Sequence, residues 1–281
     1  MRTVARIAEL RRLLAPARRA GQVIGLVPTM GALHAGHGRL IDEARRECGV
    51  VVVSIFVNPI QFNQASDYDV YPRTLAADEE FCRGRGADLI FAPDETEMYP
   101  RPLDTFVEVT RLTDHLCGAF RPGHFRGVTT VVAKLFQIVQ PDRAYFGEKD
   151  AQQLAVIRRM AAGLNMPVEI VPVATVREAD GLALSSRNQR LNRREREIAP
   201  LLYRALQAGE RLVAAGEQNA AVVKQAALAE LGREPDLKLE YLEVVDAEEM
   251  QPVEVIRGPV RIAMAAWVGE TRLIDNVLCG G

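Results

Sequence analysis

Short apolar segments with strand character alternate with helical patterns through the first part of the chain, and this alternation limits the possible folds more than any other feature. The segments are residues 23–27, 50–57, 89–92, 144–146 and 168–173. Strands that alternate with helices form a parallel sheet with crossover helices. The sequence therefore predicts an α/β fold with a Rossmann-like parallel sheet, and ligands are expected beyond the carboxyl ends of its strands.

The pattern changes after about residue 176. A loop and two helical stretches rich in Ala, Glu and Arg follow, and residues 237–245 and 260–268 then have strand character again. Mixed helices and strands of this kind indicate a second, smaller α+β domain. We expect two domains, residues 1–176 and residues 177–281.

The overall composition excludes several classes of partner. Of 281 residues 48% are hydrophobic and 26% charged, and the formal net charge is -2, which favours neither nucleic acid nor an anionic membrane. No apolar run is long enough to span a bilayer. The four cysteines are far apart and form no Cys-x-x-Cys motif, which is typical of reduced thiols. We expect a cytoplasmic protein.

The first twenty residues are rich in arginine, which raises the question of a transit peptide. Glu9 is atypical of such peptides. A stripe of apolar residues at helical spacing favours a first packed helix instead, and its members are Val4, Ile7, Leu10 and Leu14.

The segment that follows the first strand, residues 28–37, carries two imidazoles three positions apart, His34 and His37. They fall at the start of an expected helix, where backbone N–H groups and the helix dipole favour anions. A zinc pair would need a spacing such as His-Glu-x-x-His with further ligands, and this pattern does not occur. Ordinary structural histidines are the other alternative. The pattern favours a site for a nucleoside triphosphate.

Two further segments carry charges suited to phosphate. In residues 147–150, Gly147 permits close backbone approach, Lys149 offers a point charge, and Asp150 can cap the next helix or hold a ribose hydroxyl. The Ser-Ser-Arg sequence at 185–187 combines two hydroxyls with a guanidinium that grips phosphate oxygens in two places. Solvated charges at a helix cap and a plain connecting loop are the respective alternatives.

Other candidate residues carry weaker signals. Gln61 and Gln153 are neutral amides suited to orienting a hydroxy acid, although many glutamines are surface residues. Asp78 is a tentative outer ligand for a phosphate-bound magnesium, or an ordinary acid in the first turn of a helix. Residues 121–127 either contact substrate or fix the entrance to an apolar helix at 128–139, and we favour the second. The polar residues 64–71 suggest a mobile flap.

Taken together, these motifs resemble the pantothenate synthetase family, the pantoate–β-alanine ligases. The resemblance covers nearly the whole chain, in residues 28–37, 54–62, 71–74, 121–128, 146–153 and 180–188. The His-x-Gly-His element alone would name only the wider nucleotidyltransferase and class I synthetase superfamily. One position departs from the family pattern, because residue 151 is often aromatic there and is Ala151 here.

The resemblance implies an ATP- and pantoate-binding Rossmann-like domain, a C-terminal lid domain, a homodimer, and ATP with Mg²⁺. It implies catalytic roles for His37, His34 and Lys149. Gln61 and Gln153 would bind pantoate, and Gln61 also β-alanine. The residues expected to bind ATP are Met30, Gly31, Ala32, Leu33, His34, Ala35, Gly36, His37, Gly147, Glu148, Lys149, Asp150, Val176, Leu184, Ser185, Ser186 and Arg187.

The implied reaction joins pantoate to β-alanine through a pantoyl adenylate and releases pyrophosphate and AMP. A nucleotidyltransferase with another acceptor is the main alternative. A relative of the aminoacyl-tRNA synthetases is disfavoured by the near-neutral charge and by the lack of room for an anticodon-reading domain. A regulatory module that senses ATP without turnover would need fewer phosphate-directed donors.

Overall fold

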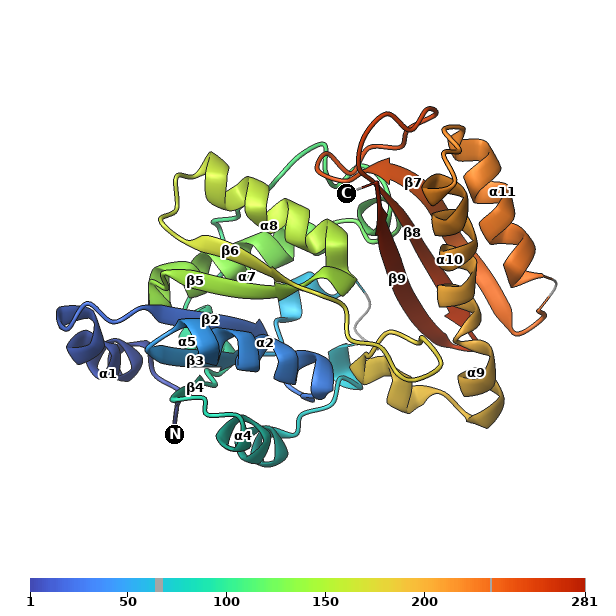
Figure 1. The fold of residues 1–281 in the computed structure, drawn as a ribbon. Coiled ribbons are helices and arrows are strands. Elements are labelled where there is room, and N and C mark those ends of the chain that lie inside the picture. The colour runs from blue at the N-terminus through green and yellow to red at the C-terminus, as the bar shows by residue number, and fades with distance from the viewer. Residues whose placement is uncertain (64–67, 233, 281) are drawn as a thin grey trace. The chain divides into compact units, whose positions relative to one another are not determined.

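The computed structural model describes residues 1–63, 68–232 and 234–280 (Figure 1). Contacts between residues divide the chain into two compact units. Unit 1 comprises Met1–Val109, Arg121–Glu148 and Val156–Ala174, and unit 2 comprises Thr110–Phe120, Lys149–Ala155 and Thr175–Gly281. The division near residue 175 lies close to the expected domain boundary. Two earlier segments nevertheless belong to unit 2, and one of them contains Lys149.

Unit 1 is built on a six-stranded sheet with the order β1-β4-β3-β2-β5-β6, and every pairing in it is parallel. The sheet confirms the predicted α/β architecture. Its strands are β1 (Arg2–Val4), β2 (Ile24–Thr29), β3 (Val50–Ile55), β4 (Leu89–Phe91), β5 (Arg143–Gly147) and β6 (Glu169–Val173).

Helices connect these strands and bury their apolar faces against the sheet. Successive strand residues face opposite sides, so Val51 and Val53 of β3 pack with Leu40 and Ile41 of α2, whereas Val52 is buried on the other side. Helix α7 contacts β2 and also packs with α1. The helical elements are α1 (Ile7–Arg19), α2 (Ala35–Glu47), η1 (Pro59–Gln61), α4 (Leu75–Gly84), α5 (Glu95–Met98), α7 (His124–Val139), η2 (Glu148–Asp150) and α8 (Ala151–Gly163). The end of η2 and the first residues of α8, up to Ala155, belong to unit 2.

The strand order places the predicted motifs at one edge of the sheet. From β2 the chain moves outward through β3 to β4, and β5 and β6 lie on the other side of β2. The order therefore reverses between β2 and β5, which is the point where open parallel sheets bind ligands. Residues 30–37, 58–62 and 147–148 lie at or just beyond the carboxyl ends of β2, β3 and β5, which are neighbours in the sheet.

Two local expectations in unit 1 need correction and one is confirmed. The expected loop at 121–127 ends early, because Gly123 adopts a left-handed conformation (φ 78°) that turns the chain and lets α7 begin at His124. Val4 lies in β1 rather than in the first helix. That helix, α1, does pack, since Leu10 and Leu14 are fully buried.

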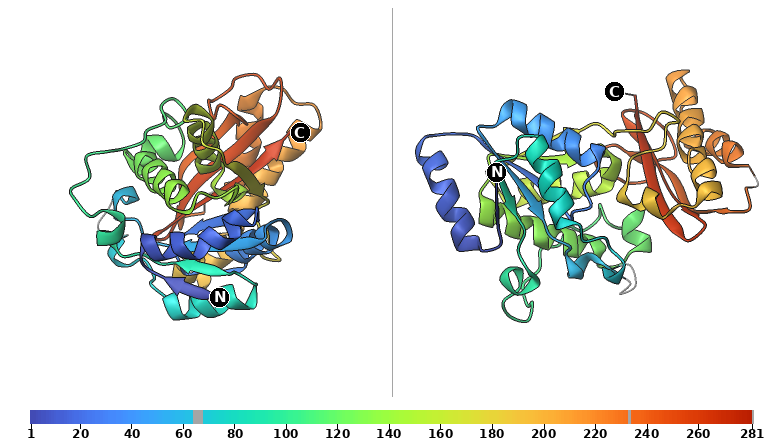
Figure 2. Two further views of the ribbon diagram at one scale, coloured as in Figure 1. Left: turned by 90° about the vertical axis from the view of Figure 1, so that its left-hand side faces the viewer. Right: turned by 90° about the horizontal axis from the view of Figure 1, so that it is seen from below.

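Unit 2 contains the antiparallel sheet β7-β8-β9, built from β7 (Leu237–Asp246), β8 (Val260–Val268) and β9 (Thr271–Cys279). The first two strands match the prediction, whereas β9 was not anticipated. One sheet face packs against α10 and α11, drawn in orange in Figure 2. Leu116, beside α6, packs on the other face with Ala263. The helical elements are α6 (Cys117–Phe120), η3 (Ser186–Arg190), α9 (Arg193–Ile198), α10 (Leu201–Ala214) and α11 (Ala220–Leu231).

Within the described residues, every helix is too short or too polar to cross a bilayer.

Candidate functional site

The two histidines of the first motif form a reciprocal cap at the start of α2, as their predicted position requires. His34 is the N-cap residue, and its Nδ1 accepts a hydrogen bond from the backbone N–H of Gly36 at 3.1 Å. His37 Nδ1 in turn accepts from the backbone N–H of His34 at 3.4 Å. The ring centroids lie 4.1 Å apart. The backbone thus holds both imidazoles in fixed, neighbouring positions.

These contacts also assign the tautomer of each ring. A ring nitrogen that accepts a backbone N–H carries no proton, so in the neutral imidazole the proton is on the other nitrogen. In its neutral form, each of the two rings therefore carries its proton on Nε2. Each ring is half-buried and offers an Nε2–H donor, which suits hydrogen bonding to an anionic oxygen.

Asp78 fixes the turn that precedes these histidines. Its Oδ2 accepts from the backbone N–H of Ala32 at 3.1 Å and its Oδ1 accepts from that of Leu33 at 2.8 Å. The Thr74 hydroxyl donates to the same carboxylate at 3.1 Å. Asp78 is 3% exposed, and a buried carboxylate is costly unless it is hydrogen-bonded. The contacts support a structural role, and a magnesium ligand at Asp78 stays a prediction.

The turn itself has an unusual backbone. Gly31 has φ 83° and Ala32 has φ 50°, and the left-handed region is unfavourable for a residue with a Cβ atom. The bonds from Asp78 compensate for this conformation. They also occupy the backbone N–H groups of Ala32 and Leu33, two residues expected to bind ATP, so the imidazoles are the better candidates for contact with phosphate.

Gln61 is held at the end of η1 by a chain of hydrogen-bonded side chains, of which Asn58 is buried and Tyr99 is half-buried. Tyr99 donates its hydroxyl to Asn58 Oδ1 at 2.8 Å, and Asn58 Nδ2 donates to Gln61 Oε1 at 2.9 Å. Burial raises the pKa of Tyr99 and keeps the phenol protonated. The Gln61 amide is thereby oriented with its Nε2 donating toward Met30 Sδ at 3.1 Å.

The loop before α7 supports the same glutamine from the other side. Arg121 Nη1 lies 3.3 Å from His124 Nε2, and because a guanidinium only donates, this ring nitrogen is the acceptor. His124 Nδ1 therefore carries the proton and donates to the Gln61 carbonyl at 2.8 Å. This geometry supports the structural interpretation of residues 121–127.

In unit 2, residues 176–184 form a short hairpin that carries several of the predicted ATP-binding residues. The backbone N–H of Leu184 donates to the Val176 carbonyl at 2.9 Å, and Arg177 and Ala183 form an antiparallel bridge. Directly after the hairpin, Ser185 caps η3 by accepting from the backbone N–H of Arg187 at 3.2 Å. Val176, Leu184 and residues 185–187 thus come together in one local structure.

Unit 2 also contains Lys149, Asp150 and Gln153. Lys149 Nζ lies 3.8 Å from Asp150 Oδ2. Gln152, next to the predicted Gln153, is 6% exposed and donates to the carbonyls of Leu112 and His115, both at 2.8 Å. These bonds anchor the start of α8, while Gln153 itself is half-buried.

The structure thus groups the candidate residues in two sets. Unit 1 contains residues 30–37, Gln61, Asp78, Gly147 and Glu148, and unit 2 contains the remainder. Residues 64–67 of the suggested flap lie outside the described residues. Among the residues that are described, no group of three or more His, Cys, Asp or Glu side chains is arranged to hold a metal ion.

Sequence reasoning missed several supporting residues. Asn58 belongs to the motif at residues 54–62, but its role depends on its burial, which the sequence does not show. Nothing in the residues around Tyr99 indicates that it contacts Asn58. Asp275 and Asn276 of β9 were also missed, because two polar residues interrupt an apolar run.

Comparison with known proteins identifies the family of this chain. The family model described as pantoate-beta-alanine ligase matches residues 2–278. A pantothenate synthetase of Moorella thermoacetica is 55% identical over 272 residues, which cover 97% of this chain and 96% of that protein.

Solved structures agree as well. The crystal structure of a pantothenate synthetase from Thermus thermophilus has a TM-score of 0.94 and 49% identity, with 99% of each chain covered. A pantoate-beta-alanine ligase from Francisella tularensis, crystallised with beta-gamma ATP and beta-alanine, has a TM-score of 0.83 and 35% identity, and the match covers 99% of this chain and 97% of that one. The chain therefore belongs to the pantoate–β-alanine ligase family.

Proposed function

We propose that this protein condenses pantoate with β-alanine, using ATP and releasing AMP and pyrophosphate. Family membership over the whole chain supports the reaction. The observation that carries the assignment of the site is the histidine cap of α2, because it fixes two Nε2–H donors side by side at a helix N-terminus. Such a pair suits an oxygen on which negative charge develops.

The first step activates the carboxylate of pantoate. One carboxylate oxygen attacks the α-phosphorus of ATP, the bond to the bridging oxygen breaks, and pyrophosphate leaves with the electron pair. The product is a pantoyl adenylate. Charge grows on the α-phosphate and on the departing group, and His34, His37 and Lys149 are the proposed groups that stabilise it.

The second step forms the amide. The neutral amine of β-alanine attacks the acyl carbon of the adenylate, the bond from that carbon to the phosphate oxygen breaks, AMP leaves with the electron pair, and one amine proton is released to solvent. Gln61, with its amide oriented by Asn58, is the proposed contact for pantoate and β-alanine, and Gln153 is a second proposed contact for pantoate. Ser185, Ser186 and Arg187 are proposed to bind ATP and to shield the adenylate from water.

The magnesium ion is proposed to arrive with ATP as part of the substrate and to be held by its phosphates. Asp78 stays the tentative outer ligand for this ion, while its carboxylate also accepts hydrogen bonds from Ala32, Leu33 and Thr74. A homodimer and a cytoplasmic location are proposed from the family resemblance, and sedimentation equilibrium checks the dimer.

Pyrophosphate–ATP exchange tests the first step directly. With pantoate and ATP but no β-alanine, the protein is expected to exchange labelled pyrophosphate into ATP. His37→Ala removes one preorganised donor and should lower the exchange rate by about a hundredfold. His37→Gln retains an amide donor but no titratable proton, so partial recovery would identify His37 as a hydrogen-bond donor.

Two controls accompany this measurement. His115→Ala removes a histidine outside the predicted motifs and should leave the exchange rate unchanged. Urea unfolding shows whether the His37 variants remain folded. If folded His37→Ala exchanges pyrophosphate at the wild-type rate, His37 does not stabilise the first step. If the protein releases a stable nucleotidyl product instead of an amide and AMP, it is a nucleotidyltransferase and not a ligase.

A further inference from the structure

Two adjacent polar residues of β9, Asp275 and Asn276, are buried although they lie in the middle of a strand. Asp275 is 5% exposed and Asn276 is 6% exposed. Successive strand residues face opposite sides of a sheet. Asp275 pairs with Met264, which belongs to the apolar cluster beneath α10, and Asn276 pairs with Ala263, which packs on the other face. Polar groups buried on both faces must be hydrogen-bonded there.

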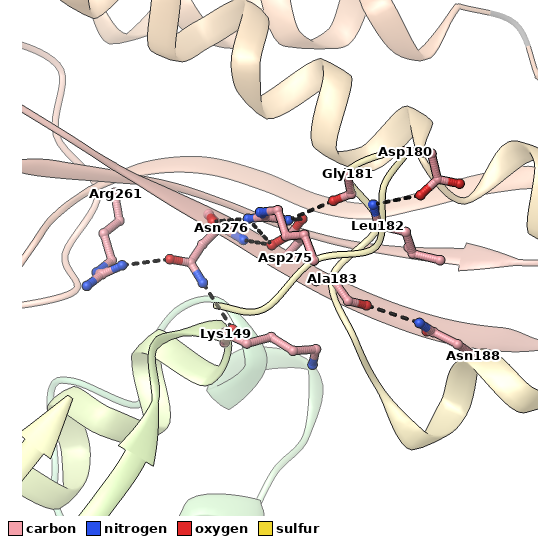
Figure 3. Close-up of polar contacts among 10 residues, drawn as sticks. Lys149, Asp180, Gly181, Leu182, Ala183, Asn188, Arg261, Asp275 and Asn276 are labelled. Carbon is pink, nitrogen blue, oxygen red and sulfur yellow. Dashed lines mark hydrogen bonds and ion pairs between the residues drawn. The ribbon is translucent and has the colours of Figure 1, made fainter. Parts of the chain in front are cut away.

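Asp275 is bound by Arg177, at the base of the hairpin that leads to residues 185–187. Arg177 Nη1 lies 2.6 Å from Asp275 Oδ2, and Nη2 lies 3.0 Å from Oδ1. The guanidinium also donates to the Gly181 carbonyl at 3.1 Å and stacks 3.8 Å from the centre of the Tyr203 ring. A two-point ion pair of this kind fixes both distance and orientation. The hairpin is thus anchored to β9 (Figure 3).

Asn276 anchors a different segment, the one that carries Lys149. Arg261 Nη1 donates to Asn276 Oδ1 at 2.7 Å, and Asn276 Nδ2 donates to the Lys149 carbonyl at 3.0 Å. Because a guanidinium has no acceptor, the oxygen of the amide must face Arg261 and its nitrogen must face Lys149. The side chain is therefore held in one orientation, with its donor on the backbone of Lys149.

We propose that Asp275 and Asn276 are positioning residues that set the phosphate-binding groups of unit 2 relative to one another. Neighbouring Cα atoms of a strand are about 3.8 Å apart, so both anchors share one rigid piece of β9. Asn276 holds the backbone of Lys149, and Asp275, through Arg177, holds the hairpin before Ser185–Arg187. The inference rests on the proposed function, which assigns ATP to these segments.

Asn276→Asp is the decisive variant, because it replaces the side-chain NH₂ group by an oxygen and keeps the size of the side chain. The new carboxylate still accepts from Arg261 but has no donor for the Lys149 carbonyl. We expect the KM for ATP in pyrophosphate exchange to rise about tenfold, the effect of losing a buried hydrogen bond, while the KM for pantoate stays unchanged. Asn276→Ala and Asp275→Asn should shift the KM for ATP in the same direction.

Leu273→Ala is the matched control. Leu273 lies on β9, is 5% exposed and packs in the apolar cluster, and its side chain has no polar atom. Its truncation should lower the urea midpoint and leave both KM values unchanged, because a loss of stability alone reduces the folded fraction and not the affinity of folded molecules. Calorimetric titration with ATP and Mg²⁺ gives a second measure of affinity.

The outcomes test the positioning role and the proposed function separately. If folded Asn276→Asp binds ATP as the wild type does, or if Leu273→Ala shifts the KM for ATP as strongly, the positioning role is wrong. A Lys149→Ala variant that loses affinity for ATP in the same experiment would show that the proposed site itself stands. Absence of pantoate-dependent exchange in the wild-type protein would instead overturn the proposed function, and the calorimetric comparison would still decide the role of Asn276.

Discussion

Asp78 shows how a single side chain organises the candidate site. The residue accepts hydrogen bonds from Ala32 and Leu33, and both donors lie more than forty positions earlier in the chain. The turn it fixes includes the left-handed Ala32 and leads directly to the cap formed by His34 and His37. From the sequence, Asp78 was a tentative outer ligand for magnesium or an ordinary acid in the first turn of a helix, and neither interpretation named its backbone partners. Its partners become visible once α4 and the turn are placed together.

Asp78→Asn tests this role. Asparagine offers one acceptor oxygen and places an NH₂ group against a backbone N–H, so one buried donor loses its partner. The free energy of unfolding should fall by about 1–3 kcal/mol, with slower pyrophosphate exchange, as measured by urea denaturation and the exchange assay. Thr74→Val removes only the hydroxyl bond and should cost about 1 kcal/mol or less. If Asp78→Asn is as stable as the wild type, Asp78 does not stabilise the turn at Ala32 and Leu33.

At the scale of elements, the position of α7 determines where Gln61 lies. Asn58 Nδ2, which also orients the Gln61 amide, donates to the Gly127 carbonyl at 3.2 Å. A Cβ atom at Gly127 would lie 2.4 Å from the Ile60 carbonyl oxygen and 2.7 Å from Gln61 Cα. Only glycine therefore allows this close approach of α7 to η1.

Gly127→Ala should force these two elements apart. We expect a loss of about 1–3 kcal/mol in the free energy of unfolding, typical of overpacking, and a higher KM for pantoate. Gly163→Ala is the control, because it also lies in a helix and its Cβ would meet no atom within 4 Å. That variant should be neutral or slightly stabilising, by about 0.5–1 kcal/mol. Equal urea midpoints for the two variants would disprove the close-packing argument.

The elements differ in how well the sequence predicts them. The strands β2, β3, β4 and β5 were predicted because each contains a continuous run of buried apolar side chains. The strand β6 was predicted from its apolar residues, although only Val173 at its end is buried. The strand β1 has only three residues and carries little pattern. The strand β9 was missed because the buried pair Asp275 and Asn276 looks like an exposed turn until its partners are known.

At the scale of the whole molecule, a carboxylate in each unit makes the folded state less stable as the pH falls. A hydrogen bond and ion pair with Arg6 lower the pKa of Glu97 in unit 1, and hydrogen bonding to Arg196 lowers the pKa of Asp180 in unit 2. An acid whose pKa is lower in the folded state stabilises the fold above its unfolded pKa. That contribution is lost as the pH falls through the folded pKa.

We therefore expect the protein to be less stable to urea at pH 4 than at pH 7. Glu97→Gln should reduce stability at pH 7 and narrow the difference between the two pH values, because the amide does not titrate. Glu254→Gln, at an exposed position, should leave the difference unchanged. If the difference in stability between pH 4 and pH 7 is equally large in Glu97→Gln and in the wild type, Glu97 does not contribute to the pH dependence.

The sequence by itself determined the α/β class, the family and the identity of the motif segments, because these depend on local periodicity and on residues that lie close together in the chain. The tertiary structure decided which side chains support those motifs. Asp78 meets the turn at Ala32 across 46 positions, and Asn276 meets Lys149 across 127 positions. Such residues come into contact only when the chain folds. Because they are then buried, the loss of a hydrogen bond between them leaves an unpaired polar group, which costs free energy.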